Sequence, residues 1–380
     1  MSLMLPSPPA GARRLTGILP RLIDMVRAGR SEAGAPVESA VLVLVDGLGR
    51  ANLTARAGHA RFLTGAMAAR DRAVTVFPST TATALTGLMT GVDAGVHGIV
   101  GYRVRHPGSG ALVNQLTGWE HDGLDPSSWQ RAETLFEAAA VAGARPVVVS
   151  RPEYRDSGFT RASFRGAEFV GERDLASRLL RAAQEAARPG TIVYAYAPEL
   201  DALGHSHGWE SDRWLAALET LDAAMRGFAR ELTGTTAALV TADHGMVDVP
   251  ARGHVLLGEG DELLDGVAAV AGEPRMLHLY TEPGRTTTDQ VVDAWRRAEG
   301  HRAWILTRAE AVSAGLFGAR VDTDVAPRIG DVLVAARGRV AYYDDRLADK
   351  GAQRMVGQHG SLTAEETIVP LIPLGALARR

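Results

Sequence analysis

The 380-residue chain contains no cysteine. Disulfide bonds and thiolate metal sites are therefore excluded, and a bound metal ion would need Asp, Glu, His or hydroxyl ligands. Lysine is nearly absent too, because Lys350 is the single lysine among 41 basic residues. The net charge of −3 gives no reason to expect a nucleic-acid polymer or an anionic membrane as partner.

The chain also lacks long hydrophobic runs. The longest candidate, TIVPLIPLGAL at 367–377, is short and is interrupted by two prolines, so it does not suit a membrane span. The first residues, MSLMLPSPPAGARRL, have prolines where a signal peptide needs a continuous apolar segment. These absences predict a cytoplasmic protein with no membrane partner.

Continuous apolar runs without alternation are the main fold signal that is present. Such runs are typical of strands buried on both faces of a parallel sheet, and they occur at 40–45, 145–150, 191–197 and 236–243. Helical patterns lie near 16–29 and, between the later runs, at 132–142, 174–187 and 212–232. This alternation predicts the α/β class, with a mostly parallel central sheet and helices on both faces.

The sequence pattern changes between residues 253 and 345, where the apolar runs are shorter and glycine is more frequent. One helix is expected near 287–299, and strands are expected in RMLHLYT, DVLVAAR and RVAYY. We interpret 253–345 as an inserted α+β cap, with 1–252 and 346–380 forming the catalytic core. The run at 366–374 predicts a returning strand of that core.

Three aspartates stand at the ends of predicted strands: Asp46, Asp201 and Asp243. Ligands of open α/β sheets bind beyond the carboxyl ends of the strands, so these side chains are expected to converge on one rim. A single strand-end aspartate is more often a helix cap. Three of them, two accompanied by histidine, favour a shared site.

The histidines strengthen this interpretation. His205 follows Asp201 by four residues, His244 directly follows Asp243, and His359 lies between glycines in GQHGS. Alone, His359 would be read as a loop residue, whereas His207 is expected to point elsewhere. Carboxylate and imidazole groups suit Zn²⁺ and similar ions, and six of them suffice for a pair of adjacent ions acting on a phosphoryl group.

Residues 77–91, FPSTTATALTGLMTG, hold five threonines and no charge. Threonine is a poor helix former, so this density indicates a turn, a capped helix start or a hydroxyl placed for chemistry. The residues alone leave Thr80, Thr81 and Thr83 as candidates for a nucleophile, with Thr86 and Thr90 assigned to packing.

In this order, the Asp46-Gly47 pair, FPSTTATALTGLMTG, DALGHSHG, TADHGM and GQHG resemble the alkaline phosphatase superfamily. The nearest branch is the type I phosphodiesterase/nucleotide pyrophosphatase family. The resemblance implies two zinc ions, although other divalent ions such as Mn²⁺ are compatible with the same ligands. It assigns one ion to Asp46, Asp243, His244 and the nucleophile's oxygen, and the other to Asp201, His205 and His359.

The family places its nucleophile ten residues before the glycine of a Thr-Gly pair, which is Thr90-Gly91 here and selects Thr81. The implied activity is hydrolysis of a small-molecule phosphate ester, with a diester or pyrophosphate favoured, through a phosphothreonine intermediate. Tyr102 is a candidate for substrate binding. One departure stands out: Ala84 occupies the position of a family asparagine that hydrogen-bonds a phosphoryl oxygen, which puts nucleotide specificity in doubt.

Several alternatives stay open. A phosphomonoesterase would ask for extra positive charge, for which Arg103 and Arg105 are available, and a phosphonate hydrolase would use the same metals. Sulfatases and metal-dependent mutases fit less well, because the chain has no cysteine and one lysine. Outside the superfamily, a non-catalytic metal-binding protein is an alternative. A dinucleotide-binding oxidoreductase is a weak one, because Asn52 replaces the third glycine after Gly47 and Gly49.

Overall fold

The apolar run at 40–45 lies within β2 (Ser39–Val45), in which every residue is buried. In the computed structural model, which describes residues 5–7 and 9–379, β2 pairs in parallel with β8 (Thr191–Ala197) on one side and β9 (Thr236–Thr241) on the other. A strand with neighbours on both edges and helices on both faces has no exposed surface, which explains its uninterrupted Val and Leu residues.

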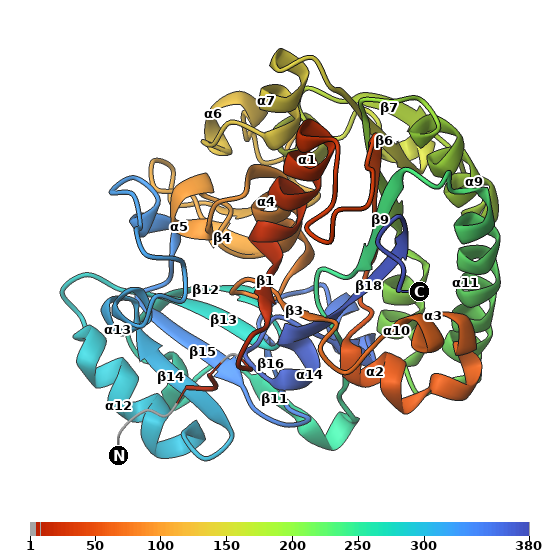
Figure 1. Cartoon of the computed structure of the whole chain (residues 1–380). Coiled ribbons are helices and arrows are strands. Elements are labelled where there is room, and N and C mark those ends of the chain that lie inside the picture. The colour runs from red at the N-terminus through yellow and green to blue at the C-terminus, as the bar shows by residue number, and fades with distance from the viewer. Residues whose placement is uncertain (1–4, 8, 380) are drawn as a thin grey trace.

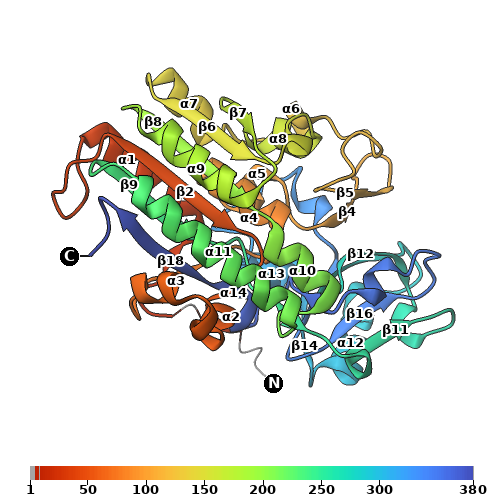
Figure 2. The same ribbon diagram turned by 90° about the vertical axis from the view of Figure 1, so that its right-hand side faces the viewer.

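Within the described residues the main sheet has eight strands (Figures 1 and 2). Its order is β1 (Arg13–Arg14), β3 (Arg72–Val74), β18 (Ile368–Gly375), β9, β2, β8, β6 (Arg145–Ser150) and β7 (Glu168–Gly171). The predicted returning strand is β18, and it runs antiparallel to both β9 and β3. The other pairs in the sheet are parallel, so the predicted class is confirmed.

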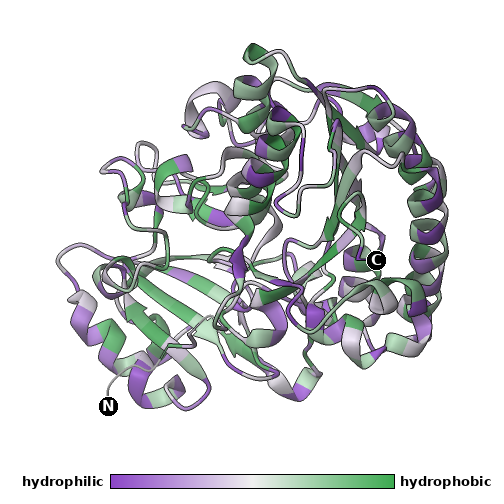
Figure 3. Cartoon of the chain, viewed as in Figure 1, coloured by the Kyte–Doolittle hydropathy of each residue, from purple (hydrophilic) through white to green (hydrophobic). Residues whose placement is uncertain are grey.

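Helices cover both faces of this sheet. On one face α9 (Leu175–Ala186) packs on β8, β6 and β2, and α11 (Asp212–Glu231) lies beside it; the opposite face carries α1 (Ile18–Ala28) and α7 (Leu135–Val141) (Figure 2). Figure 1 shows the two helical layers at either side of the sheet, and Figure 3 shows apolar strands between helices whose outer faces are hydrophilic. The predicted helices therefore exist, with ends shifted by a few residues.

Shorter elements connect these layers. The remaining helices of the core are α2 (Arg50–Ala55), α3 (Arg61–Ala66), α4 (Thr81–Thr90), α5 (Ala94–His97), α6 (Pro126–Trp129), α8 (Gly158–Ser163), α10 (Glu199–His207) and α14 (Ala364–Thr367). Two small antiparallel pairs join β4 (Arg103–Arg105) to β5 (Leu112–Asn114) and β10 (Val247–Asp248) to β17 (Gly357–Gln358). Among the described residues, no helix has both the length and the apolar character that a bilayer crossing requires.

A second sheet lies in the region between 253 and 345. Its order is β12 (Val267–Glu273), β13 (Met276–Thr281), β15 (Val332–Ala336) and β14 (Ala303–Thr307), with α12 (Thr288–Glu299) and α13 (Arg308–Ser313) beside it, while β11 (His254–Leu257) pairs with β16 (Ala341–Asp344). One face encloses a hydrophobic cluster of its own, and residues such as Met276 and Leu333 of the other face join the main core. The division of the chain into a core and a cap at 253–345 stays a prediction.

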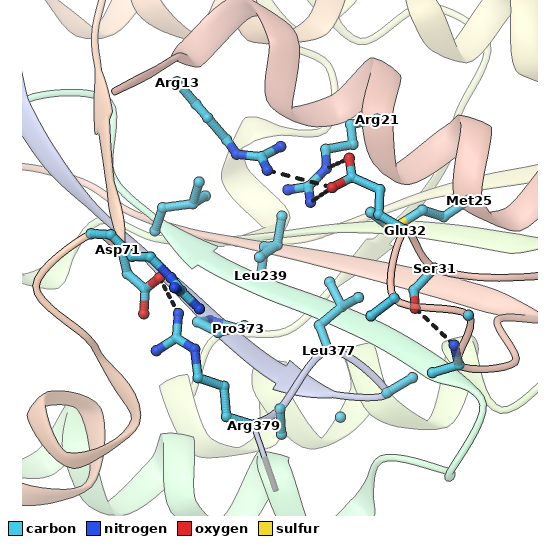
Figure 4. A pocket seen from close by; sticks show the side chains of 18 of the residues that line it. Arg13, Arg21, Met25, Ser31, Glu32, Asp71, Leu239, Pro373, Leu377 and Arg379 are labelled. Carbon is cyan, nitrogen blue, oxygen red and sulfur yellow. Dashed lines mark hydrogen bonds and ion pairs between the residues drawn. The ribbon is translucent and has the colours of Figure 1, made fainter. Parts of the chain in front are cut away.

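A cleft of about 1140 Å³ opens over β9 and β18, between α1 and the turn at 70–72 (Figure 4). Leu239 and Pro373 form part of its floor. Five of its lining residues are arginines, of which Arg21 pairs with Glu32 and Arg379 pairs with Asp71.

Candidate metal centre and active site

Three adjacent strands bring the predicted aspartates together. Asp46 directly follows β2, Asp243 follows β9, and Asp201 lies in α10, which begins just after β8. Because β9, β2 and β8 are parallel neighbours, their carboxyl ends meet at one edge of the sheet. Gly47 permits the close approach, since its φ is +72° and a Cβ there would lie 3.0 Å from the Cα of Asp201.

The six predicted ligands form two groups of three. Asp46, Asp243 and His244 make one group, and the other consists of Asp201, His205 and His359; within each group the candidate ligand atoms lie within 4.8 Å of one another. The rings of His244 and His359 stack with their centroids 3.6 Å apart, so the two groups adjoin. This is the division that the sequence resemblance implies.

Backbone carbonyls orient all three imidazoles. The Nδ1–H groups of His205, His244 and His359 donate to the carbonyl oxygens of Gly357 (2.8 Å), Gly245 (3.1 Å) and Ser79 (3.0 Å) respectively. A carbonyl cannot donate, so each Nδ1 carries a proton, and in the neutral ring Nε2 then presents a lone pair.

These lone pairs face carboxylate oxygens. The Nε2 of His205 lies 3.5 Å from Oδ1 of Asp201, and the Nε2 of His244 lies 3.5 Å from Oδ1 of Asp46 and 3.4 Å from Oδ2 of Asp243. Two acceptors at such distances repel unless a cation lies between them. The arrangement therefore has the donor set of a metal site.

The carboxylates of this cluster also include oxygens that lack a hydrogen-bond partner. Asp46 Oδ1, Asp201 Oδ1 and Asp243 Oδ2 are buried and have no hydrogen-bond partner. Their other interactions are satisfied: Tyr196 donates to Oδ2 of Asp46, and Oδ1 of Asp243 accepts from the backbone of Gly47 at 3.2 Å and of His244 at 3.0 Å. Unpartnered buried carboxylate oxygens are costly, so these residues fit a pair of divalent cations.

Burial also favours the neutral forms of two of these ligands. It raises the pKa of Asp46 well above the ordinary value, and the Asp243 and Asp201 carboxylates add to the effect. Burial, with the neighbouring His244 and His205, lowers the pKa of His359 well below its usual range. Both shifts are those expected of ligands that are desolvated before an ion arrives.

Metal binding is expected to release a proton wherever Asp46 is still protonated. Asp46 must lose its proton to become a ligand, and since its pKa is raised, the apparent metal affinity should rise with pH; His359, whose pKa is lowered, releases none. Titration calorimetry in two buffers of different ionisation enthalpy measures the number released. Asp46→Asn should release fewer protons, and a pH-independent affinity in the wild-type protein would contradict the prediction.

Thr81 is the first residue of α4, and its Oγ1 lies 3.1 Å from Nε2 of His244. The other two hydroxyl candidates lie elsewhere. Thr80 interacts with the carboxyl group of Glu273, and the Oγ1 of Thr83 is buried without a partner. Of the three, Thr81 is the one whose hydroxyl contacts a member of the metal groups.

A cavity of about 320 Å³ adjoins Thr81. Aromatic side chains form much of its wall: Trp119, Tyr154, Phe159, Phe164, Phe169, Tyr194 and Tyr196. The described residues that line it include no basic side chain. The buried hydroxyl of Tyr194 has no hydrogen-bond partner, so a ligand inside could accept from it.

Not every candidate from the sequence lies at this cavity. Tyr102 is not among its lining residues, so a substrate-binding role for it stays a prediction. Arg105 stacks on the ring of Tyr280 at 4.5 Å, and His207 contacts Arg213. The alternation of Tyr194 and Tyr196 in TIVYAYA could have indicated an aromatic face beside Asp201.

Glu273 is a further residue that the sequence pattern did not indicate. Its side chain is 8% exposed and its Oε2 lies 3.6 Å from Nδ1 of His359. Burial raises its pKa well above the ordinary value. It comes from the end of β12 in the cap, where no motif distinguishes it from a surface acid.

The mostly parallel sheet and the two ligand groups at its edge have the arrangement that the sequence resemblance implies. A family profile described as "Type I phosphodiesterase / nucleotide pyrophosphatase" matches residues 40–362, and the chain belongs to this family. It is therefore a divalent-metal-dependent hydrolase of phosphoric ester or phosphoanhydride bonds. A search of curated proteins found no match.

Several solved structures share the fold. Murine ectonucleotide pyrophosphatase/phosphodiesterase 5 is 18% identical, with 87% of each chain covered and a TM-score of 0.67. An inactive threonine-to-alanine variant of the murine protein, in complex with AMP, gives 18% identity, coverage of 89% of this chain and 88% of that chain, and a TM-score of 0.68. Phosphonoacetate hydrolase from Sinorhizobium meliloti 1021, in complex with phosphonoacetate, is 21% identical, with 89% and 91% covered and a TM-score of 0.67.

Proposed function

We propose that the protein hydrolyses a small phosphodiester or phosphoanhydride with Thr81 as the nucleophile and two zinc ions. The observation that carries the proposal is the set of three unpartnered, buried carboxylate oxygens facing imidazole Nε2 lone pairs beside one threonine hydroxyl. A non-catalytic metal site would need neither that hydroxyl nor the adjoining cavity. The inactive threonine-to-alanine variant of the murine relative also supports the assignment of the nucleophile.

When bound, the two ions supply positive charge to the nucleophile, to the phosphoryl oxygens and to the leaving oxygen. Thr81 loses its hydroxyl proton to solvent and its Oγ1 attacks phosphorus in line. The bond to the leaving oxygen breaks, that oxygen takes a proton from solvent, and a phosphothreonine forms that still carries the other substituent of the substrate. Water then cleaves this intermediate and restores the threonine. The ring nitrogen that contacts the hydroxyl belongs to His244, a proposed ligand, so the scheme includes no general-base side chain.

Backbone groups hold the phosphoryl group in this scheme. Thr81 opens α4, and the N–H groups of the first helical turn have no acceptor within the helix. Pointing toward the N-terminal end, they favour a bound anion. They are the available replacement for the amide that the family carries at the position of Ala84.

The cavity beside Thr81 indicates the class of ester. Its aromatic wall continues from Tyr154 through Tyr196 and Tyr194 to Phe164, with successive ring centroids 6.0, 6.3 and 5.0 Å apart. Rings in this arrangement favour a flat, uncharged organic group that accepts one hydrogen bond from Tyr194. A carboxylate-bearing phosphonate is the second candidate, and the absence of basic side chains among the described lining residues disfavours it.

A panel of substrates tests the proposal. With zinc supplied, we expect faster hydrolysis of a diester with aromatic groups than of a monoester, a methyl diester or phosphonoacetate, each followed by chromatography. Tyr154→Ala should raise KM about tenfold for the aromatic diester and leave the methyl diester unchanged, because it removes one wall of the cavity. Equal rates with and without metal would refute the function, and preferred cleavage of phosphonoacetate would select the second candidate.

Two further proposals concern the partners of the site and the location of the protein. We propose small-molecule phosphate esters as the partners of the site and the cytoplasm as its location.

A further inference from the structure

Glu273 is the one side chain of the cap that contacts both the turn before Thr81 and the segment that carries His359, among the described interactions. Its carboxyl group interacts with Thr80, and its Oε2 lies 3.6 Å from Nδ1 of His359. The two segments also pair directly, because the backbone N–H of Ser79 donates to the carbonyl of Gly360 at 3.2 Å. Glu273 therefore lies where the nucleophile turn and the ligand loop meet.

The packing around Glu273 is tight on the side of the ligand loop. A Cβ at Gly360 would lie 2.7 Å from Cδ of Glu273, so this side chain can occupy its place because position 360 has no side chain. Gly360 also has a φ of +122°, a conformation that other residues rarely adopt. The glycine after His359 thus makes room for a carboxyl group behind the imidazole.

His359 differs in this respect from the other two proposed histidine ligands. The Nδ1 groups of His205 and His244 are contacted by the backbone carbonyls of Gly357 and Gly245. Only His359, among the three, has a carboxyl side chain near Nδ1 in addition to its carbonyl acceptor, which belongs to Ser79. The 3.6 Å separation is longer than a hydrogen bond, so the carboxyl group would act on the imidazole by packing behind the ring and, when ionised, through its charge.

We propose that Glu273 is a positioning residue for the metal group of Asp201, His205 and His359, and that the cap thereby takes part in building the metal centre. Its carboxyl group holds the His359 ring with Nε2 toward Asp201 and ties that ring to the turn that presents Thr81. The inference rests on the proposed function, because it needs His359 to bind an ion. It assigns Glu273 no contact with substrate.

Metal affinities measured in variants that keep only one of the two metal groups complete test this role. Asp243→Asn weakens the group of Asp46, Asp243 and His244 and keeps the Asp201 group complete. Asp201→Asn weakens the Asp201 group and keeps the other one complete. In the Asp243→Asn background we expect Glu273→Gln to weaken zinc binding about 10–100-fold in a chelator competition. In the Asp201→Asn background the same substitution should have no effect.

Spectroscopy and stability separate positioning from a structural role. With Co²⁺ in place of zinc, Glu273→Gln should change the visible absorption of the Asp201 group alone. The unfolding temperature of the metal-free protein should not fall, since glutamine keeps the volume and removes a buried acid. Glu273→Leu should give a larger loss of affinity and provides a second test if the glutamine variant folds poorly. Glu299→Gln, a buried acid on the far side of the cap beside Tyr342 and Arg302, is the matched control.

The outcomes distinguish this inference from the proposed function. If the wild-type protein does not bind two ions, the proposed function fails before Glu273 is tested. If it binds two ions and Glu273→Gln and Glu273→Leu leave both affinities and the cobalt spectrum unchanged, Glu273 is not a positioning residue. Equal weakening of both groups would also overturn the inference.

Discussion

Thr81→Ala should lower kcat by a factor on the order of 10⁴ or more while both metal ions still bind. The reason is that the substitution removes the atom that forms the covalent intermediate, whereas the six carboxylate and imidazole ligands stay in place. Steady-state assays on an aromatic diester, combined with metal analysis of the purified variant, measure the two effects. Acid quenching of the wild-type reaction should trap the phosphoryl group, with its remaining organic substituent, on Thr81, detectable by mass spectrometry.

Thr83→Ala provides the matched control for this experiment. It removes a hydroxyl from the same helix, two residues away, and that hydroxyl is buried without a hydrogen-bond partner. Its loss should leave kcat within about twofold, since no described contact depends on it. A Thr81→Ala enzyme with near-normal turnover, or a phosphate trapped on another residue, would show that the nucleophile is misassigned.

Arg275→Met should lower the free energy of unfolding by about 3–5 kcal/mol. Arg275 and Glu366 form an ion pair in which both side chains are 0% exposed, with bonds of 2.7 and 2.8 Å, and Arg275 also donates to the carbonyls of Gly338 and Val340. The substitution leaves a buried carboxylate without its cation. Denaturant unfolding monitored by circular dichroism would measure the loss.

An exposed pair in the same cap supplies the comparison. Arg296 makes a two-bond contact with Glu310 at 2.8 Å, but these side chains are 35% and 45% exposed. Water screens such pairs, so Arg296→Met should cost no more than about 1 kcal/mol. Similar losses for the two variants would mean that burial does not set the strength of the Arg275 pair. In the double variant Arg275→Met/Glu366→Met, part of the loss should be recovered, because no isolated charge remains.

The parallel sheet and its ligand rim could be predicted because both depend on local patterns. Strands buried on two faces appear as unbroken apolar runs, and a strand-end aspartate needs no knowledge of its partners to be recognised. Two features of the sheet escaped this reasoning. β1 and β3 have two and three residues, too few for any periodicity, and the apolar run of β18 carries no sign that it is antiparallel.

The site residues that lie within motifs could be predicted, and those outside motifs could not. The residues left Thr80, Thr81 and Thr83 open, and only the family resemblance selected Thr81. The aromatic cavity was missed because Phe159 and Phe164 lie in or just after a six-residue helix, α8, which no pattern indicated. Glu273 was missed because its contact with His359 joins the end of β12 to the residue that follows β17, and local sequence patterns do not indicate such long-range packing.

The order of the ligands along the chain has a consequence for maturation. Asp46 is the first of the six to be synthesised and His359 the last, and the entire cap lies between Asp243 and His359. The second metal group therefore stays incomplete until translation has passed the cap, and pairing of β10 with β17 then brings His359 back to the rim. Such long-range closure is slow compared with helix formation. Occupancy of the Asp201, His205 and His359 group would accordingly report that this pairing has formed in a newly made molecule.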